Sequence, residues 1–280
     1  MRIKRIIVER LFGVFDHDIP LNRDDRITII YGPNGFGKTY TLMLVNELFN
    51  PGFGDFFRIP FRRVAAVLED DSTLSVKRDE KDGSAKLLFE YGKPGASPQS
   101  FEFGDMEEKL SREPAWLRKL KKDVGVDLIH TERLIEITDN DWSTMTETVL
   151  RCSKTFKKRC DLLTEIVNAR FVHKRMTIDE RDGIVFTTAD GKKLGPEHLS
   201  SGERHILLVL FRLLYIVNPD SLILLDEPEL SLHIVWQQQL LVDLEKIIRL
   251  TGVDILVATH SPQIIHDRWD LAVELKDPGA

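Results

Sequence analysis

The segment 32–39, Gly-Pro-Asn-Gly-Phe-Gly-Lys-Thr, constrains the fold most, because it fits the pattern G-x-x-x-x-G-K-[ST] without a mismatch. The β-branched run 26–30 before it predicts a strand, and the apolar spacing of 40–48 after it predicts a helix. Glycines let the backbone wrap closely around an anion, and the N–H groups at a helix N-terminus face that anion. This order of strand, loop and helix predicts a phosphate-binding loop in an α/β sheet.

The residue types of the loop predict how it would hold a nucleoside triphosphate. Lys38 should reach the β- and γ-phosphates as a catalytic cation, and the Thr39 hydroxyl should ligate Mg²⁺. The nucleotide-binding residues expected in this segment are Gly32, Pro33, Asn34, Gly35, Phe36, Gly37, Lys38, Thr39 and Tyr40.

Two further apolar runs end in residues that could do chemistry. The run 222–225 is typical of a buried parallel strand, and Asp226 and Glu227 follow it at the end where functional groups gather. We expect Asp226 to hold Mg²⁺ and Glu227 to orient and deprotonate the attacking water. The run 254–259 ends at His260, which can hydrogen-bond a γ-phosphate. An acidic helix cap and a structural histidine would look the same in isolation, and the phosphate loop favours the catalytic interpretation.

The segment 199–203, Leu-Ser-Ser-Gly-Glu, precedes the apolar helical run 206–216. Its serines fit a helix N-cap, and in isolation a cap is the better interpretation. A second helix N-terminus rich in Ser and Gly is also a second anion site, which matters in a chain that already has a phosphate loop. The nucleotide contacts expected here are Ser200, Ser201, Gly202 and Glu203.

These four segments, in this order, resemble the ATP-binding cassette (ABC) ATPases, whose signature is usually Leu-Ser-Gly-Gly-Gln. Here Ser201 stands in place of the first Gly and Glu203 in place of Gln. The resemblance implies a P-loop NTPase fold, ATP and Mg²⁺ as cofactors, and an ATPase reaction. It also implies a head-to-tail homodimer, or a larger multiple, in which each signature covers the ATP of the other copy. Residues 228–233 resemble the D-loop, which in this family lies between the two copies.

Within that family the chain resembles the branch that includes SMC, RecF and OLD-type proteins, a group of AAA family ATP-binding proteins. The opening 3–13 resembles the first strand of this branch, and 259–262, Thr-His-Ser-Pro, lacks the acid that transporter ATPases usually have after the His. The segment 226–233 resembles prokaryotic OLD-like ATPases, several of which serve phage defence. The family's Gln loop follows a strand, here predicted at 126–130, and its matching position makes Glu132 a candidate metal contact.

Composition limits the class of protein. The chain has 280 residues, 42% of them hydrophobic, which is enough for one large or two joined domains. No apolar run is long enough to cross a bilayer, and the N-terminus lacks the apolar region of a signal peptide. Cys152 and Cys160 have no His partners at zinc-like spacing, so we expect reduced thiols in a cytoplasmic protein without a membrane partner.

The predicted fold is α/β, with a mixed sheet, an antiparallel β meander and a helical insertion. Residues 1–104 form an N-terminal ATPase lobe with the phosphate loop, 105–175 the insertion, and 176–280 a C-terminal lobe with the signature, the acidic strand and His260. Within the insertion, apolar spacing over 143–171 predicts one helix roughly 40 Å long. The expected antiparallel strands are 63–68, 73–77 and 86–90, followed later by a hairpin of 176–179 and 184–188.

Three functions compete at this stage. The first is an ABC-type ATPase whose ATP-gated dimerisation regulates a protein effector, such as a nuclease, in prokaryotic phage defence. The second is an SMC/RecF-like DNA clamp or DNA-repair ATPase, which basic clusters around 118–122, 154–159 and 170–175 could serve, although a solvated helix face is favoured there. The net charge of −6 argues against a nucleic-acid footprint over the whole protein but not against a local patch. The third is the ATPase component of a membrane transporter. Salt-dependent DNA binding and co-purification with a membrane protein would separate them.

Overall fold

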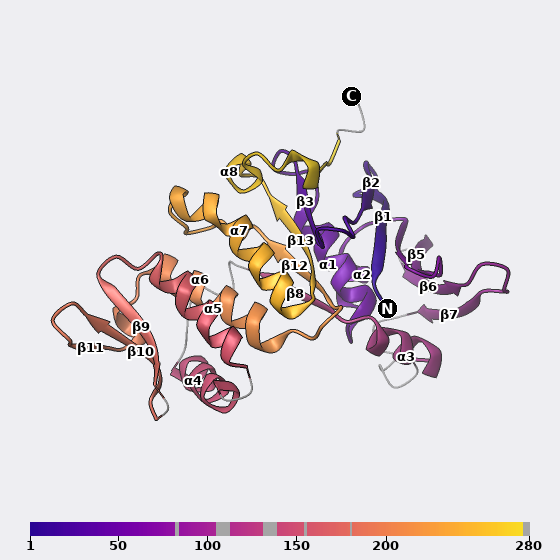
Figure 1. The fold of residues 1–280 in the computed structure, drawn as a ribbon. Helices are drawn as coiled ribbons and strands as arrows, with labels where there is room; N and C mark the ends of the chain where they lie inside the picture. The colour runs from indigo at the N-terminus through magenta and orange to yellow at the C-terminus, as the bar shows by residue number, and fades with distance from the viewer. Residues whose placement is uncertain (82–83, 105–112, 131–138, 154–155, 180, 277–280) are drawn as a thin grey trace. The chain divides into compact units, whose positions relative to one another are not determined.

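The computed structural model describes the chain except for residues 82–83, 105–112, 131–138, 154–155, 180 and 277–280 (Figure 1). Contacts within the chain divide it into two compact units. The first comprises 1–129, 220–226 and 253–280, and the second comprises 130–219 and 227–252. The phosphate loop therefore lies in the first unit and the segment 199–203 in the second. The division into 1–104, 105–175 and 176–280 that the sequence predicts does not coincide with these units. It remains a prediction.

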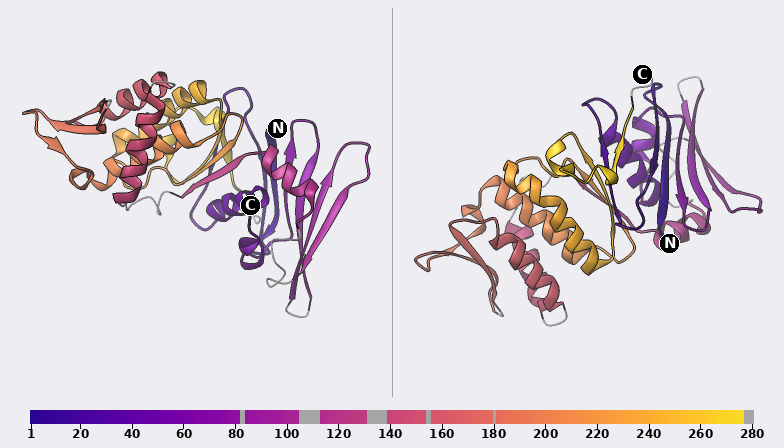
Figure 2. Two further views of the ribbon diagram at one scale, coloured as in Figure 1. Left: turned by 90° about the horizontal axis from the view of Figure 1, so that it is seen from below. Right: turned by 45° about the horizontal axis from the view of Figure 1, so that its top comes forward.

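The first unit contains two sheets (Figure 2). The antiparallel sheet has the order β2-β1-β4-β5-β6-β7, with strands β1 (Ile3–Leu11), β2 (Phe15–Pro20), β4 (Arg63–Leu68), β5 (Thr73–Lys81), β6 (Ser84–Gly92) and β7 (Gln99–Gly104). The second sheet has the order β14-β3-β13-β12-β8, with β8 (Val126–His130), β12 (Leu222–Asp226), β13 (Asp254–Thr259), β14 (Ala272–Glu274) and β3 (Ile27–Tyr31). The four strands β14, β3, β13 and β12 run parallel.

Helix α1 (Lys38–Phe49) packs against β4 of the antiparallel sheet and against β12 and β13 of the parallel sheet. Its consecutive residues Leu42, Met43, Leu44 and Val45 are all buried, as expected for a helix with a sheet on each side. The remaining helical segments of this unit are α2 (Gly54–Arg58), α3 (Ala115–Asp123), α8 (Pro262–Ile265) and the short turn η5 (Trp269–Leu271).

The second unit is mainly helical, with one small antiparallel sheet of order β11-β10-β9. Its core includes a row of neighbouring rings, Trp142, Phe186, Phe171 and Trp236, with centroids 5.6 to 6.1 Å apart. The elements are α4 (Asp139–Ser153), α5 (Lys157–Asn168), β9 (Lys174–Asp179), β10 (Gly183–Thr188), β11 (Lys193–Leu194), η3 (Pro196–His198), α6 (Ser201–Phe211), the π-helical turn η4 (Arg212–Ile216) and α7 (Ile234–Thr251).

The expected strands and the hairpin are confirmed, but the single helix over 143–171 is wrong. The structure has two helices there, α4 and α5, which contact each other. Phe156, which precedes α5, has φ of −123° and ψ of 44°, outside helical geometry. The apolar spacing continues through both helices because each buries one face, so the spacing alone does not reveal the break. None of the helices among the described residues is both long and apolar enough to cross a membrane.

A buried ion pair holds part of the second unit together. Arg170, just after α5, donates to the carboxylate of Asp243 on α7, and the two side chains are only 5% and 6% exposed. Burial raises the pKa of Asp243 in spite of the neighbouring guanidinium. Two charges with so little access to water stabilise the fold only while both are present.

Replacement of the buried cation should therefore be costly. We expect Arg170→Met to lower the free energy of unfolding by about 3–5 kcal/mol, because it leaves a buried carboxylate without a partner. Chemical denaturation measures this. The matched control is Lys246→Met, which removes an exposed ion pair with Glu165 between the same two helices and should cost no more than about 1 kcal/mol. A similar loss of unfolding free energy in both variants would contradict a special role of the buried ion pair.

Candidate functional site

The phosphate loop connects β3 to α1 with a backbone that needs glycine. Gly32, Gly35 and Gly37 have φ of 156°, 87° and 78°, and Gly37 is the N-cap of α1. A Cβ atom on Gly37 would lie 2.5 Å from Cδ2 of Leu11 on β1. A side chain at this position would therefore clash with the antiparallel sheet, as well as strain the backbone.

The polar side chains at the end of the loop lie close to the carboxyl end of strand β12 in the parallel sheet. The buried ammonium of Lys38 donates to the carbonyls of Gly32 at 2.7 Å and Pro33 at 3.1 Å, which closes the loop on itself. Thr39 donates through its hydroxyl to the Asp226 carboxylate at the end of β12, with a distance of 3.0 Å. The sequence predicted Thr39 and Asp226 as metal contacts, and the structure brings their oxygens together. Such oxygens suit Mg²⁺, so the donor set fits the predicted ion.

His260 lies beside the start of the phosphate loop. It follows β13, is exposed, and lines a cavity of about 420 Å³. Trp269 lines the same cavity and packs edge-on against Tyr31 with ring centroids 5.4 Å apart. Gly32, Pro33 and Asn34 form another wall of this cavity, so His260 faces a space that the loop also faces. Its predicted hydrogen bond to a γ-phosphate remains a prediction.

Glu227 directly follows Asp226 and has a φ of 47°, which few residues other than glycine adopt. The amide of Leu230 donates to the Glu227 carbonyl at 3.1 Å, so the chain turns sharply after β12. Seven other described non-glycine residues also have a positive φ, so this backbone geometry marks a turn, and the catalytic role of Glu227 stays a prediction. Glu132, the other acidic candidate, lies outside the described residues.

The predicted N-cap of the signature helix is confirmed. Ser200 is the N-cap of α6, where its hydroxyl accepts from the Glu203 amide at 3.3 Å and its own amide donates to the Glu203 carboxylate at 2.7 Å. These two bonds form a reciprocal capping box. The contact of Ser200, Ser201, Gly202 and Glu203 with a nucleotide remains a prediction.

The signature helix also packs against the segment 228–233, which follows the acidic strand. A Cβ atom on Gly202 would lie 2.6 Å from the carbonyl oxygen of Ser231, so only glycine fits there. The ring of His205, buried on α6, hydrogen-bonds through Nε2 to the carbonyl of Pro228 at 3.2 Å. The signature and the D-loop-like segment therefore form one packed part of the second unit.

Two neighbours of the phosphate loop were not predicted from the sequence. His17, buried on β2, hydrogen-bonds through Nε2 to the carbonyl of Phe36 at 2.9 Å and so supports the loop from the antiparallel sheet. Phe12 packs edge-on against Tyr40 with centroids 4.9 Å apart, and these residues are 39% and 40% exposed. The only sequence signal for Phe12 is an aromatic residue next to a turn glycine, Gly13, which does not by itself indicate a site.

Each basic cluster contributes at least one cation to contacts inside the protein. Arg159 donates to the carbonyl of Leu214 at 2.7 Å and lies over the ring of Phe156. Lys121 pairs with Glu113 at 2.8 Å. Arg170 forms the buried ion pair with Asp243. These contacts account for one cation of each cluster, while others, such as Lys119, Lys158 and Arg175, are exposed.

Parts of the chain are similar to known proteins. Residues 153–266 match a family model described as "AAA domain, putative AbiEii toxin, Type IV TA system". A segment of 79 residues is 38% identical to the "Retron Ec83 probable ATPase" of Escherichia coli. That match covers 24% of this chain, and the chain spans only 14% of the length of that relative.

Solved structures show the fold over nearly the whole chain. The SMC head domain from Thermotoga maritima superposes with a TM-score of 0.53 and 16% identity, covering 99% of this chain and 97% of that one. An SMC head bound to the C-winged helix domain of ScpA gives a TM-score of 0.58 and 11% identity, covering 99% and 96%.

The solved structures share the fold of this chain, which confirms the predicted fold class. The AAA-domain match over 153–266 and the similarity to a probable ATPase agree with the ATPase expected from the sequence. More specifically, the fold of the chain is similar to that of SMC head domains.

The two buried histidines should make folding sensitive to acid. Burial lowers the pKa of both His17 and His205. In the unfolded chain a histidine takes up a proton near pH 6.5, so below that pH the unfolded state binds more protons than the folded state. Stability is then complete above about pH 6.5 and is lost as the pH falls further. We expect the double variant His17→Gln/His205→Gln to show a shallower loss of unfolding free energy between about pH 7 and 5 in denaturant titrations. If the unfolding free energy of the double variant fell with pH as steeply as that of the parent, these histidines would not be the cause of the acid sensitivity.

Proposed function

We propose that this protein binds ATP with Mg²⁺, hydrolyses it, and pairs head to tail with a second copy while ATP is bound. The observation that carries the proposal is the convergence of Lys38, Thr39 and Asp226 at the end of the phosphate loop. Lys38 offsets the charge of the β- and γ-phosphates, and the loop amides of 32–39 surround them.

The other residues around the loop complete the proposed reaction. Thr39 and Asp226 hold Mg²⁺, which, when bound, neutralises and orients the phosphates. Glu227 accepts the proton of the attacking water, and His260 hydrogen-bonds the γ-phosphate. The exposed rings of Phe12 and Tyr40 offer apolar faces to the base.

The signature is proposed to act on the nucleotide of the second copy. The phosphate loop and the segment 199–203 belong to different compact units. ATP would stabilise the pair because it contacts both chains, whereas ADP lacks the γ-phosphate that joins them. A pair of this kind is symmetric and has two identical composite sites.

Pairing and release are proposed to regulate a protein effector, such as a nuclease, in phage defence in the prokaryotic cytoplasm. The similarity to the retron ATPase supports the defence role, together with the OLD-like segment 226–233. The DNA clamp stays the second candidate. One cation of each basic cluster has a partner inside the protein, and others, such as Lys119, Lys158 and Arg175, are exposed.

Removal of the proposed base should separate binding from hydrolysis. Glu227→Gln should bind ATP but hydrolyse it at least about 100-fold more slowly, because an amide cannot accept the water proton. In analytical ultracentrifugation, the variant should sediment as a dimer or larger multiple with MgATP and as a smaller species with ADP. Lys38→Ala is the control that should bind no ATP. Normal turnover in Glu227→Gln would remove Glu227 from its assigned role.

Mixing two inactive variants tests whether the signature acts on the second copy. Ser200→Arg should block pairing by adding bulk and charge while leaving ATP binding to the phosphate loop intact, and Lys38→Ala should fail to bind ATP. A heterodimer of the two has one complete site, with Lys38 and Ser200 from different chains. Because neither variant pairs with itself, each pair that forms is a heterodimer with one of its two sites complete. An equal mixture should therefore recover up to about half of wild-type ATPase activity. Full activity of Ser200→Arg alone would contradict a shared site.

A further inference from the structure

The signature of this chain places a carboxylate where the proposed function needs an anion site. Glu203 lies in the first turn of α6, whose N-terminus would face the γ-phosphate of the second copy's ATP. The ATP phosphates are negatively charged, so an uncompensated carboxylate at this helix end would repel the nucleotide it is meant to hold.

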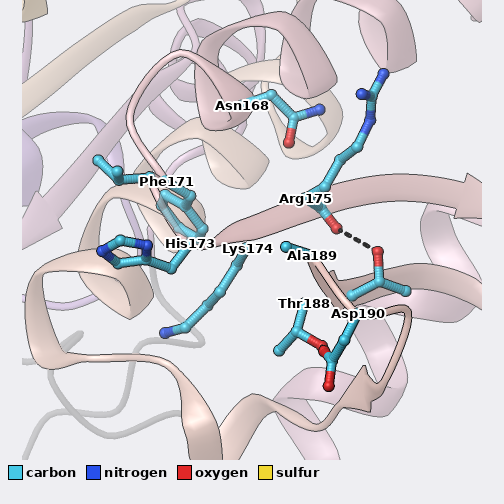
Figure 3. A pocket seen from close by; sticks show the side chains of 10 residues that line it. Asn168, Phe171, His173, Lys174, Arg175, Thr188, Ala189 and Asp190 are labelled. Carbon is cyan, nitrogen blue, oxygen red and sulfur yellow. Dashed lines mark hydrogen bonds between the residues drawn. The ribbon is translucent and has the colours of Figure 1, made fainter.

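Lys174 compensates this charge. Its ammonium lies 2.7 Å from Oε2 of Glu203, and the two side chains are only 19% and 12% exposed. The same ammonium donates to the carbonyl of His198 at 2.7 Å, in the turn that leads into the signature. Figure 3 shows Lys174 in the wall of an open pocket, next to His173 and Phe171. The ion pair is therefore sheltered, and one cation touches both the signature helix and the segment before it.

The carboxylate of Glu203 has a second partner on the same oxygen. Oε2 also accepts from the Ser200 amide at 2.7 Å, as part of the capping box. Burial raises the pKa of Glu203, but the Lys174 ion pair and the Ser200 hydrogen bonds outweigh it and lower the pKa overall. Glu203 is thus a charged group that is held inside the cap and paired with a cation.

The position of Lys174 is set by the strand that it begins. The side-chain amide of Asn168, at the end of α5, accepts from the Met176 amide at 2.7 Å and donates to the Met176 carbonyl at 2.9 Å. This double hydrogen bond ties β9 to α5 two residues after Lys174. The lysine therefore projects from an anchored strand.

We propose that Lys174 is a positioning residue of the composite ATP site. It cancels the charge of Glu203 and holds that side chain in the cap, and this leaves the helix N-terminus positive toward the phosphate of a second copy. Among the described residues, the first-turn amides of Ser201 and Gly202 have no acceptor in the cap, and they are the donors available for that phosphate. This inference rests on the proposed function, because it assumes that the signature meets ATP.

A charge-cancelling pair of substitutions tests the proposal. In the Glu227→Gln background with MgATP, Lys174→Gln should weaken dimerisation at least about tenfold in sedimentation equilibrium, because Glu203 is left as an uncompensated charge. Adding Glu203→Gln to Lys174→Gln removes that charge and should restore dimerisation to within about threefold of the parent, since the amide oxygen still accepts from Ser200. Lys174→Arg keeps the cation and should also pair like the parent.

The controls separate a charge effect from damage to the fold. Lys193→Gln removes an exposed lysine of the same small sheet, which pairs with Asp182, and should leave dimerisation unchanged. ATP binding by the monomer, measured with a fluorescent analogue in the Ser200→Arg background, should be the same with and without Lys174→Gln. If the double variant stays as weak as Lys174→Gln, Lys174 acts through folding and the inference is overturned.

Two outcomes separate a failure of this inference from a failure of the proposed function. A parent that dimerises with MgATP while Lys174→Gln dimerises equally well overturns the inference and leaves the proposed function standing. A parent that does not dimerise with MgATP overturns the proposed function, and the inference with it.

Discussion

Burial of α1 on both sides is the constraint on which the phosphate loop depends. The helix is packed between an antiparallel and a parallel sheet, so its first turn cannot shift without disturbing both. The close approach of Leu11 to Gly37 and the hydrogen bond from His17 to the Phe36 carbonyl attach the loop to the antiparallel sheet. The hydrogen bond from Thr39 attaches the start of α1 to the parallel sheet. The loop is thus held in shape by two layers, which is the preorganisation that an anion site needs.

Several cations of the second unit have hydrogen-bond or ion-pair partners inside the protein. Arg170, Arg159 and Lys174 lie in stretches of sequence that look like basic patches, yet each has an acceptor inside the protein. Two of them neutralise carboxylates that would otherwise be costly to shelter from water. A basic stretch of sequence in this unit therefore contains both cations with internal acceptors and exposed cations, such as Lys158 and Arg175.

Sequence patterns predicted the local elements well and the long-range contacts poorly. The loop 32–39, the strand at 222–226 and the cap at Ser200 each follow from neighbours in sequence, so their residue types were sufficient. The break between α4 and α5 was missed because periodicity reports the buried face of a helix and not where the helix ends. The contacts of His17 and Lys174 were missed because the first joins β2 to the loop, and the second joins the start of β9 to α6. No local pattern marks such partners.

The double hydrogen bond from Asn168 to Met176 has a consequence for association between chains. β9 is an edge strand of its three-stranded sheet, and the unpaired backbone of an edge strand invites a strand from another molecule. The Asn168 amide occupies both backbone groups of Met176 and so takes the place of that strand at the middle of β9. A strand that added to β9 at this point would first have to break both of these hydrogen bonds.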